Sequence, residues 1–305
     1  MQQTALVGLL VLASAAFAAA QTAEAPRTPW GAPDLSGYWE YRSTTPLERP
    51  AELAGRERLT PDEEAAYLVE RHAAIGRERD LQLNADWWQP GGLTDGRTAL
   101  IVDPPDGRLP ARTPAGRERV RTLDVGFRAR TADGPEDRER YERCIMGRTV
   151  PLMAVSPNRL AQIFQTPDYV AILHEQNSDL RIIPLDGRRT PAEAIRQWQG
   201  TSRGRWESDT LVVETIGFNG KWTLRGAGPN VRYVERIRRA GAEALEYEFT
   251  AYDAESFAAA WTVAFPITRA TGPLFENACH EGNYSMPLIL RGARAQERER
   301  LRQQP

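Results

Sequence analysis

Alternating apolar and polar residues in the second half of the chain constrain its fold more than any other feature. From Leu160 to Thr268 the apolar residues recur at every second position, which is the period of a β-strand. In the segment YVAILHE, the residues Val170, Ile172 and His174 share one face and the other face carries Glu175. His174 therefore continues an apolar face, and Glu175 points the opposite way.

Several such segments follow one another, joined by turns of about two to five residues, which favours antiparallel neighbours. We predict strands within 98–102, 158–187 (three short strands), 211–218, 231–240, 244–253 and 258–268, and helices at 61–75, 114–123, 136–143, from 190, and 287–300. A Gly two residues before Trp39 resembles the opening strand of lipocalin-like barrels, with an ordinary aromatic anchor as the alternative. The predicted fold is α+β: a mostly antiparallel, lipocalin-like β-barrel or curved sheet with N-terminal helical segments and a C-terminal helix.

The N-terminus predicts export. Residues 1–20, MQQTALVGLLVLASAAFAAA, form an apolar run that ends in small residues, as in a secretory signal peptide; an uncleaved anchor is the alternative. Residues 21–305 then form a single β-rich domain, periplasmic or extracellular, without a later stable membrane span. A formal net charge of −2 gives no basic excess for nucleic-acid binding. The oligomeric state is not specified by these features.

An oxidising compartment changes how the two cysteines are interpreted. Cys144 and Cys279 are expected to form a disulfide there, with free thiols as the alternative. The bond would join the segment that enters the sheet to the segment that leaves it.

Several strings resemble a large family of exported bacterial proteins whose reaction is not known. They are QIFQTPDYV, RIIPLDG, GRWESDTLVVET and ACHEGNYSMPLILRGARA, spread over roughly Leu100 to Arg298. The resemblance implies export and one shared fold, without a reaction. Ser178 stands where that family often has His, and Ser208 where it often has Gly. The first difference removes a further histidine from the loop before Asp179.

Two His-Glu dipeptides suggest acid-base chemistry. His174 with Glu175, and His280 with Glu281, are the candidate catalytic residues, because imidazole changes its charge near neutral pH and a carboxylate adjusts that change. The alternatives are a packing histidine at 174 and, for HEGNY, a cap on the disulfide turn and the terminal helix.

Five further residues are candidate substrate-binding groups. Arg143 and Arg181 suit a carboxylate, a phenolate or a developing oxyanion, and Asn283 and Tyr284 suit a hydroxyl group. Trp88 is expected to rim a pocket, with a stabilising lid as the alternative.

Other chemistries find less support in the sequence. His174, His280 and one carboxylate could bind zinc, but no H-x-H, HExxH or CxxC spacing is present, so we predict neither a metal nor a cofactor. The string Gly200–Gly204, GTSRG, matches a nucleophile elbow in letters, but it follows a predicted helix and precedes a strand, the reverse of the required order.

Two functions remain. The first is a cofactor-independent acid-base enzyme, a lyase, isomerase or hydrolase, that acts on a small organic substrate in the barrel with His280 and Glu281 at its centre. The second is a noncatalytic carrier of a small hydrophobic or aromatic ligand. An enzyme needs ionisable groups that converge in the pocket, whereas a carrier pocket is lined almost wholly by apolar groups.

Overall fold

The fold comes from a computed structural model of the chain. It describes residues 25–80, 94–123, 132–140, 142–147, 149–154, 159–188, 195–221 and 224–303, with the backbone alone for 71–80. The expected signal peptide, Trp88 and the start of the helix expected from 190 lie outside these residues. The part of that helix expected at Ile195 and Trp198 is not helical, and Gln197 forms an isolated bridge with Phe218. None of the helices in the described ranges is long and apolar enough to cross a bilayer.

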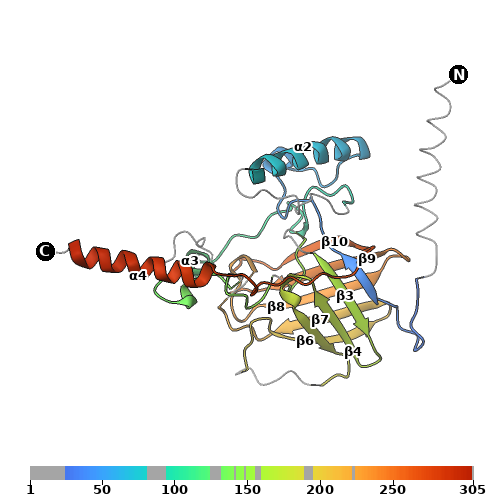
Figure 1. The fold of residues 1–305 in the computed structure, drawn as a ribbon. Coiled ribbons are helices and arrows are strands. Elements are labelled where there is room, and N and C mark those ends of the chain that lie inside the picture. The colour runs from blue at the N-terminus through green and yellow to red at the C-terminus, as the bar shows by residue number, and fades with distance from the viewer. Residues whose placement is uncertain are drawn as a thin grey trace.

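Ten strands of the described chain form one antiparallel sheet. The strands are β1 (Gly37–Glu40), β2 (Ile101–Asp103), β3 (Leu160–Gln165), β4 (Tyr169–His174), β5 (Leu180–Pro184), β6 (Thr201–Glu207), β7 (Thr210–Ile216), β8 (Arg232–Arg239), β9 (Ala244–Tyr252) and β10 (Trp261–Arg269). Their order is β5-β4-β3-β1-β10-β9-β8-β7-β6, and β2 pairs with β10. The predicted fold class is confirmed: the sheet curls into a nearly closed barrel (Figure 1).

The two end strands of the sheet meet through side chains. The Nε of Arg181 on β5 donates to the Oγ of Ser202 on β6 at 2.8 Å. Gly204 on β6 lies so close to β5 that an added Cβ would stand 2.6 Å from Leu185 Cδ2 and 2.9 Å from Ile183 Cγ2. The seam between β5 and β6 therefore depends on a glycine and on a buried arginine.

The inward faces of the strands form the apolar core, as the alternation predicted. On β9 the buried residues are Leu245, Tyr247, Phe249 and Ala251. At one end Trp39 is 1% exposed and its Nε1 donates to Leu35 O at 2.8 Å. The guanidinium carbons of Arg239 and Arg269 each lie 4.9 Å from the Trp39 ring centroid. Further buried aromatic side chains from β8 to β10 are Tyr233, Trp261 and Phe265.

Three α-helices in the described residues accompany the barrel: α2 (Pro61–Asp80), α3 (Pro114–Leu123) and α4 (Ser285–Gln303). Thr60 caps α2 as predicted: its backbone N donates to Glu63 Oε2 at 2.9 Å, and its Oγ1 accepts from Glu63 N at 3.4 Å, which is a capping box. Figure 1 shows α2 above the barrel and α4 pointing away from it.

Several predicted boundaries were wrong. α2 passes Gly76, the predicted stop, because an interior Gly costs only about 1 kcal/mol and the following RERD residues favour a helix. The predicted helix at 136–143 is a 3₁₀ turn, η2 (Pro135–Asp137). The GTSRG string, expected before a strand, is itself part of a strand: it runs into β6, where Ser202 is buried. The turn that follows β6 places Ser208 at a φ of 52°, in the left-handed region that favours glycine.

Candidate functional site

The imidazole of His174 lies in the protein interior at the end of β4. It is 0% exposed, and its Nδ1 lies 3.3 Å from the hydroxyl of Tyr41. Burial, assisted by the positive charge of Arg181, lowers the pKa of His174 from 6.5 to about 3. Burial also raises the pKa of the Tyr41 phenol. Both groups are therefore neutral at physiological pH.

Asp179 lies next to His174 across the turn between β4 and β5. The backbone N of His174 donates to Asp179 O at 2.9 Å. The carboxylate of Asp179 accepts from Gly147 N at 2.7 Å and from Thr149 Oγ1 at 3.1 Å. Burial raises the pKa of this carboxyl, whereas the two hydrogen bonds and the charge of Arg140 oppose the increase.

Buried polar atoms without a hydrogen-bond partner in the described structure gather at this turn. They are His174 Nε2, Glu175 Oε2, and both Oδ1 and Nδ2 of Asn177. Asn177 and Ser178, in η3 (Gln176–Ser178), adopt left-handed φ values of 58° and 51°. Such unpaired groups cost about 1–3 kcal/mol each, and strain of this kind often occurs at functional sites. We call Tyr41, His174, Glu175, Asn177 and Asp179 the His174 cluster.

Glu175 directly follows His174 after the end of β4 and is half-buried, and its charge helps to raise the pKa of the Tyr41 phenol, so we count it in this cluster. Its backbone N donates to Leu160 O at 3.0 Å. Partial burial raises the pKa of Glu175, and the positive charge of Arg42 opposes that increase. The cluster thus contains a neutral imidazole, a neutral phenol and two carboxyls that accept a proton more readily than usual.

Arg181, a predicted substrate-binding residue, is engaged by the protein itself. Its guanidinium pairs with Glu235 on β8, with Nη1 donating to Oε1 at 2.9 Å and Nη2 donating to Oε2. The remaining donors bind Ser202 Oγ at 2.8 Å and Thr215 Oγ1 at 2.7 Å. Tyr247 completes the group by donating its hydroxyl to Glu235 Oε1 at 2.8 Å. A guanidinium that is 4% exposed needs such partners to offset its lost hydration.

A buried segment, residues 146–147 and 149–154, runs between these two polar groups; we call it the inner strap. Near its start Gly147 and Thr149 bind Asp179, and further along Leu152 N donates to Tyr247 Oη at 2.9 Å. Val150, Leu152, Met153 and Ala154 belong to the same apolar core as the strands. Part of the barrel interior is therefore filled by the chain itself.

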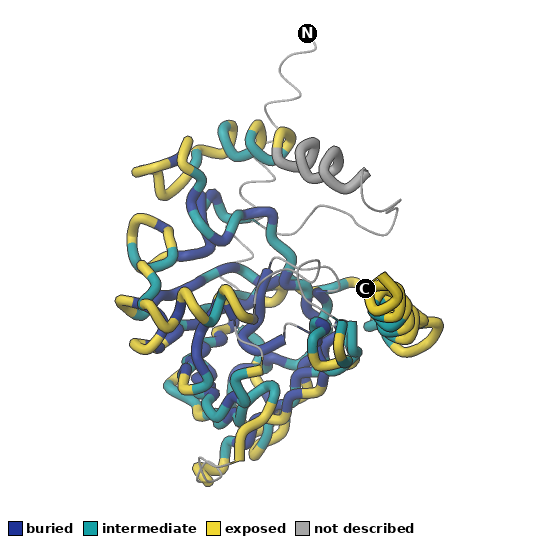
Figure 2. Tube along the Cα trace, turned by 90° about the vertical axis from the view of Figure 1, so that its left-hand side faces the viewer, coloured by how far each residue is buried: buried dark blue, intermediate teal, exposed yellow. Residues whose placement is uncertain are grey.

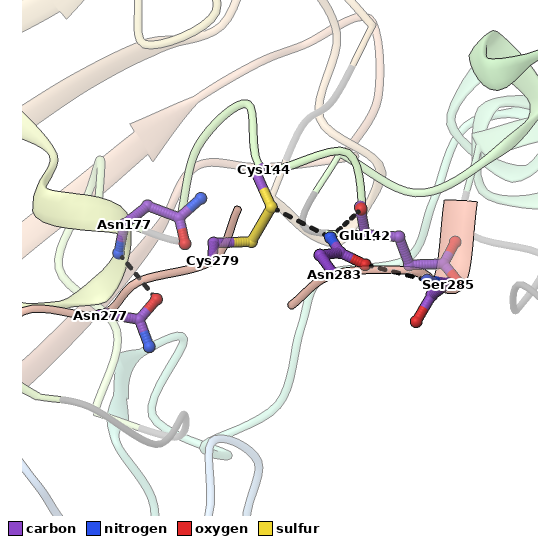
Figure 3. The surroundings of a disulfide bond; sticks show 7 residues. All are labelled: Glu142, Cys144, Asn177, Asn277, Cys279, Asn283 and Ser285. Atoms are coloured by element: carbon purple, nitrogen blue, oxygen red, sulfur yellow. Dashed lines mark hydrogen bonds between the residues drawn. A yellow bond between two sulfur atoms is a disulfide. The ribbon is translucent and has the colours of Figure 1, made fainter. Parts of the chain in front are cut away.

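The predicted disulfide is present. Cys144 and Cys279 are joined, with a sequence separation of 135 residues (Figure 3). Asn283, a predicted substrate-binding residue, supports this bond: its Nδ2 donates to Glu142 O at 3.2 Å and to Cys144 Sγ at 3.3 Å. The backbone N of Asn177 donates to Asn277 Oδ1 at 3.3 Å, so the disulfide loop also contacts the His174 cluster (Figure 3).

The other predicted site residues lie outside the His174 cluster. His280 and Glu281 are exposed in the loop after the disulfide, and Tyr284 is 72% exposed. Arg143 pairs with Glu136 at 3.4 Å. The structure thus buries His174, leaves Glu175 half-buried beside it, and leaves the second His-Glu pair at the surface.

Some residues of the interior were missed by sequence reasoning. Glu235 occupies an apolar-face position of β8 between Tyr233 and Ile237, so a charged residue in that alternation was a usable signal. Tyr41 gave no such signal, because it follows β1 and is distant in sequence from His174.

Comparison of the chain with protein-family models, curated proteins and solved structures found no match. Within the described ranges, no group of three or more His, Cys, Asp or Glu residues is arranged to hold a metal ion.

Proposed function

We propose that the protein is an exported, cofactor-independent acid-base enzyme. Its barrel would bind a small organic substrate at the His174 cluster. The reaction class is that of a lyase, isomerase or hydrolase. The observation that carries the proposal is the fully buried imidazole of His174, whose Nε2 has no partner among the described residues. A bound substrate that supplied this partner would remove a cost of about 1–3 kcal/mol.

The chemistry follows from the two ring nitrogens. When the Tyr41 hydroxyl donates to Nδ1, the ring proton of the neutral imidazole is on Nε2. A neutral imidazole donor of this kind polarises a carbonyl oxygen and stabilises the charge that develops there. The carboxyl of Glu175, with its raised pKa and its unpaired Oε2, is suited to accept the proton removed from the same substrate. His174 and Glu175 thus have the roles of electrophile and base.

This assignment moves the centre of the site within the sequence. The sequence favoured His280 and Glu281, which are exposed, whereas the proposal places the reaction at the buried His174 beside Tyr41. A noncatalytic carrier is the second candidate, supported by the aromatic side chains of Phe249 and Trp261 in the core. The two functions differ in whether ligand binding depends on His174.

The test is a panel of small lactones, ketones and esters, with binding measured by NMR on both the ligand and the His174 ring protons, and turnover by product formation. We expect binders that shift the His174 ring resonances and that lose at least about tenfold in affinity in His174→Phe, the loss of one good hydrogen bond. Turnover should be lost in Glu175→Gln while binding persists. His280→Ala is the matched control and should behave as wild type.

Three results would contradict the proposal. One is ligand binding that His174→Phe leaves unchanged, which would favour the carrier. Another is loss of turnover in His280→Ala with full activity in His174→Phe. The third is the absence of any binder in the carbonyl panel, while circular dichroism shows wild type and variants equally folded.

A further inference from the structure

The side-chain amide of Asn177 has no role in the chemistry proposed above. Both of its polar atoms, Oδ1 and Nδ2, are buried and have no hydrogen-bond partner among the described residues. A buried donor or acceptor without a partner is costly, because it has lost its hydration and gained nothing in return. An amide with both atoms in this state therefore needs an explanation.

The backbone around Asn177 is well held, so the amide has a fixed place. Its N donates to Asn277 Oδ1 at 3.3 Å, and the N of Ser178 donates to Glu175 O at 3.3 Å. Asn177 has a φ of 58° and a ψ of 14°, a left-handed conformation that Asn adopts more readily than most residues. This preference explains an Asn in the turn, and Gly would meet it as well. It does not explain a buried amide without partners.

The amide lies on the side of η3 that faces the disulfide. In Figure 3 the Asn177 side chain extends from η3 toward the Cys144–Cys279 bond. The preceding residue, Gln176, is packed tightly against the inner strap, since an added Cβ on Gly147 would stand 2.7 Å from its Oε1. The strap thus closes on Gln176 and leaves the neighbouring amide without a polar partner.

The surroundings of the amide also exclude bulk water. Buried and half-buried segments make up most of the described barrel, whereas the outer side of α4 is exposed (Figure 2). A polar group on such an exposed face binds water. The two amide atoms of Asn177 are buried, so their partner has to come from the protein or from a bound molecule.

The chemistry of a primary amide restricts what can bind it. Its C=O accepts and its N–H donates along one edge, so both atoms are satisfied at once by a group that offers a donor and an acceptor side by side. Lactams and primary carboxamides have such an edge. A secondary amide in its usual trans form has its N–H and C=O on opposite edges, and esters and lactones have no N–H donor.

We propose that Asn177 determines the specificity of the site by binding a lactam or a primary carboxamide group through two hydrogen bonds. The inference rests on the proposed function, and it narrows the substrate from carbonyl compounds in general to these two classes. His174 and Asn177 flank one stretch of the turn between β4 and β5. Three residues span at most about 11 Å even when extended, so one small molecule can reach both side chains.

The first experiment compares three probes of nearly the same size on the full mature chain: pyrrolidinone, N-methylpyrrolidinone and butyrolactone. All three carry a ring carbonyl, but only pyrrolidinone also carries an N–H beside it. Binding is measured by NMR titration. We expect pyrrolidinone to bind at least about tenfold more tightly than the other two, the gain from one further good hydrogen bond.

The second experiment assigns this preference to the amide. Asn177→Gly keeps the left-handed backbone and removes the amide, so pyrrolidinone should then bind no more tightly than N-methylpyrrolidinone. Ser178→Gly is the matched control, because Ser178 lies in the same turn at a φ of 51° and its side chain is exposed. It should keep the full preference. The two variants should unfold at the same urea concentration, since the Asn177 amide has no partner to lose.

Two outcomes overturn the inference. One is binding that depends on His174 but shows no preference for pyrrolidinone, which leaves the proposed function intact and removes this role of Asn177. The other is an Asn177→Gly protein that is clearly less stable than Ser178→Gly, because the amide then has a structural partner. Binding of all three probes that His174→Phe leaves unchanged contradicts the proposed function instead.

Discussion

The buried imidazole of His174 couples the stability of the protein to pH. Its pKa is about 3 in the folded chain and 6.5 as the ordinary value. Between these two pKa values the imidazole is protonated in the unfolded chain and neutral in the folded chain. The stability that this difference confers is fully present above pH 6.5, and it is lost as the pH falls toward 3. Asp179 and Glu175, whose pKa values are raised, act in the opposite direction.

A comparison with His174→Phe isolates this contribution. Between pH 7 and pH 5 the His174 contribution to the free energy of unfolding should fall by about 2 kcal/mol. In urea titrations the wild type should lose this amount relative to His174→Phe over the same pH range, whatever the offset between the two proteins at pH 7. Parallel stability profiles for the two proteins would show that His174 is not a buried neutral imidazole.

The sequence predicted the orientation of His174 but not its surroundings. Alternation along β4 placed the imidazole on the apolar face, and the structure agrees. Its partner Tyr41 is 133 residues away, and short-range periodicity carries no information on such a contact. Arg181 was predicted to bind a substrate because the sequence does not show that Glu235 on β8 is its ion-pair partner. Pairing across strands depends on barrel closure, which the alternation of single strands does not determine.

Among the elements of the fold, the inner strap depends most on tertiary contacts. It has no strand or helix of its own in the described residues, and it is held by Asp179, by Tyr247 and by the disulfide at Cys144. Its sequence contains no alternation that would predict burial. The sequence did predict the disulfide, because the chain has two cysteines and an N-terminus that predicts an oxidising compartment.

Removing the disulfide should loosen the strap more than the sheet. In the chain-entropy account, opening a loop of 135 residues lowers the free energy of unfolding by on the order of 5 kcal/mol. The double variant Cys144→Ser/Cys279→Ser should lose stability of that order in urea titrations. Hydrogen exchange should rise first in the strap and in 277–283, while β8 and β9 remain protected.

Two results would contradict this account of the strap. One is a double variant as stable as the oxidised wild type. The other is hydrogen exchange that rises equally in the strap and in all strands, which would mean that the bond stabilises the molecule as a whole and not this segment.

At the scale of the whole molecule, the barrel is closed differently on its two sides. From β5 through β4, β3, β1, β10, β9, β8 and β7 to β6, each strand is joined to the next by a backbone ladder. The two end strands, β5 and β6, meet instead through Arg181 and the close approach at Gly204. Most of the strands and the antiparallel pairing of consecutive ones followed from the sequence pattern, but β6 and the seam did not. Gly204, a glycine in the middle of a strand, is the sequence feature that indicates this close approach.

The seam predicts that Gly204→Ala destabilises the barrel. The added methyl group would meet Leu185 and Ile183 at 2.6 and 2.9 Å, so β5 and β6 must separate or the two side chains must shift. Overpacking of this kind costs typically about 1–3 kcal/mol. Urea unfolding should show that loss, and hydrogen exchange should rise along β5 and β6 before it rises in β9.

Gly272→Ala is the matched control, because a Cβ at that position meets no atom within 4 Å and the backbone there does not require glycine. Its stability should stay within about 0.5 kcal/mol of wild type, as for surface changes generally. If Gly204→Ala behaves like this control, β5 and β6 are not in contact and the sheet is open at this edge. An open edge would also free Arg181 from Ser202, and the polar group in the interior would then be accessible to solvent through the seam.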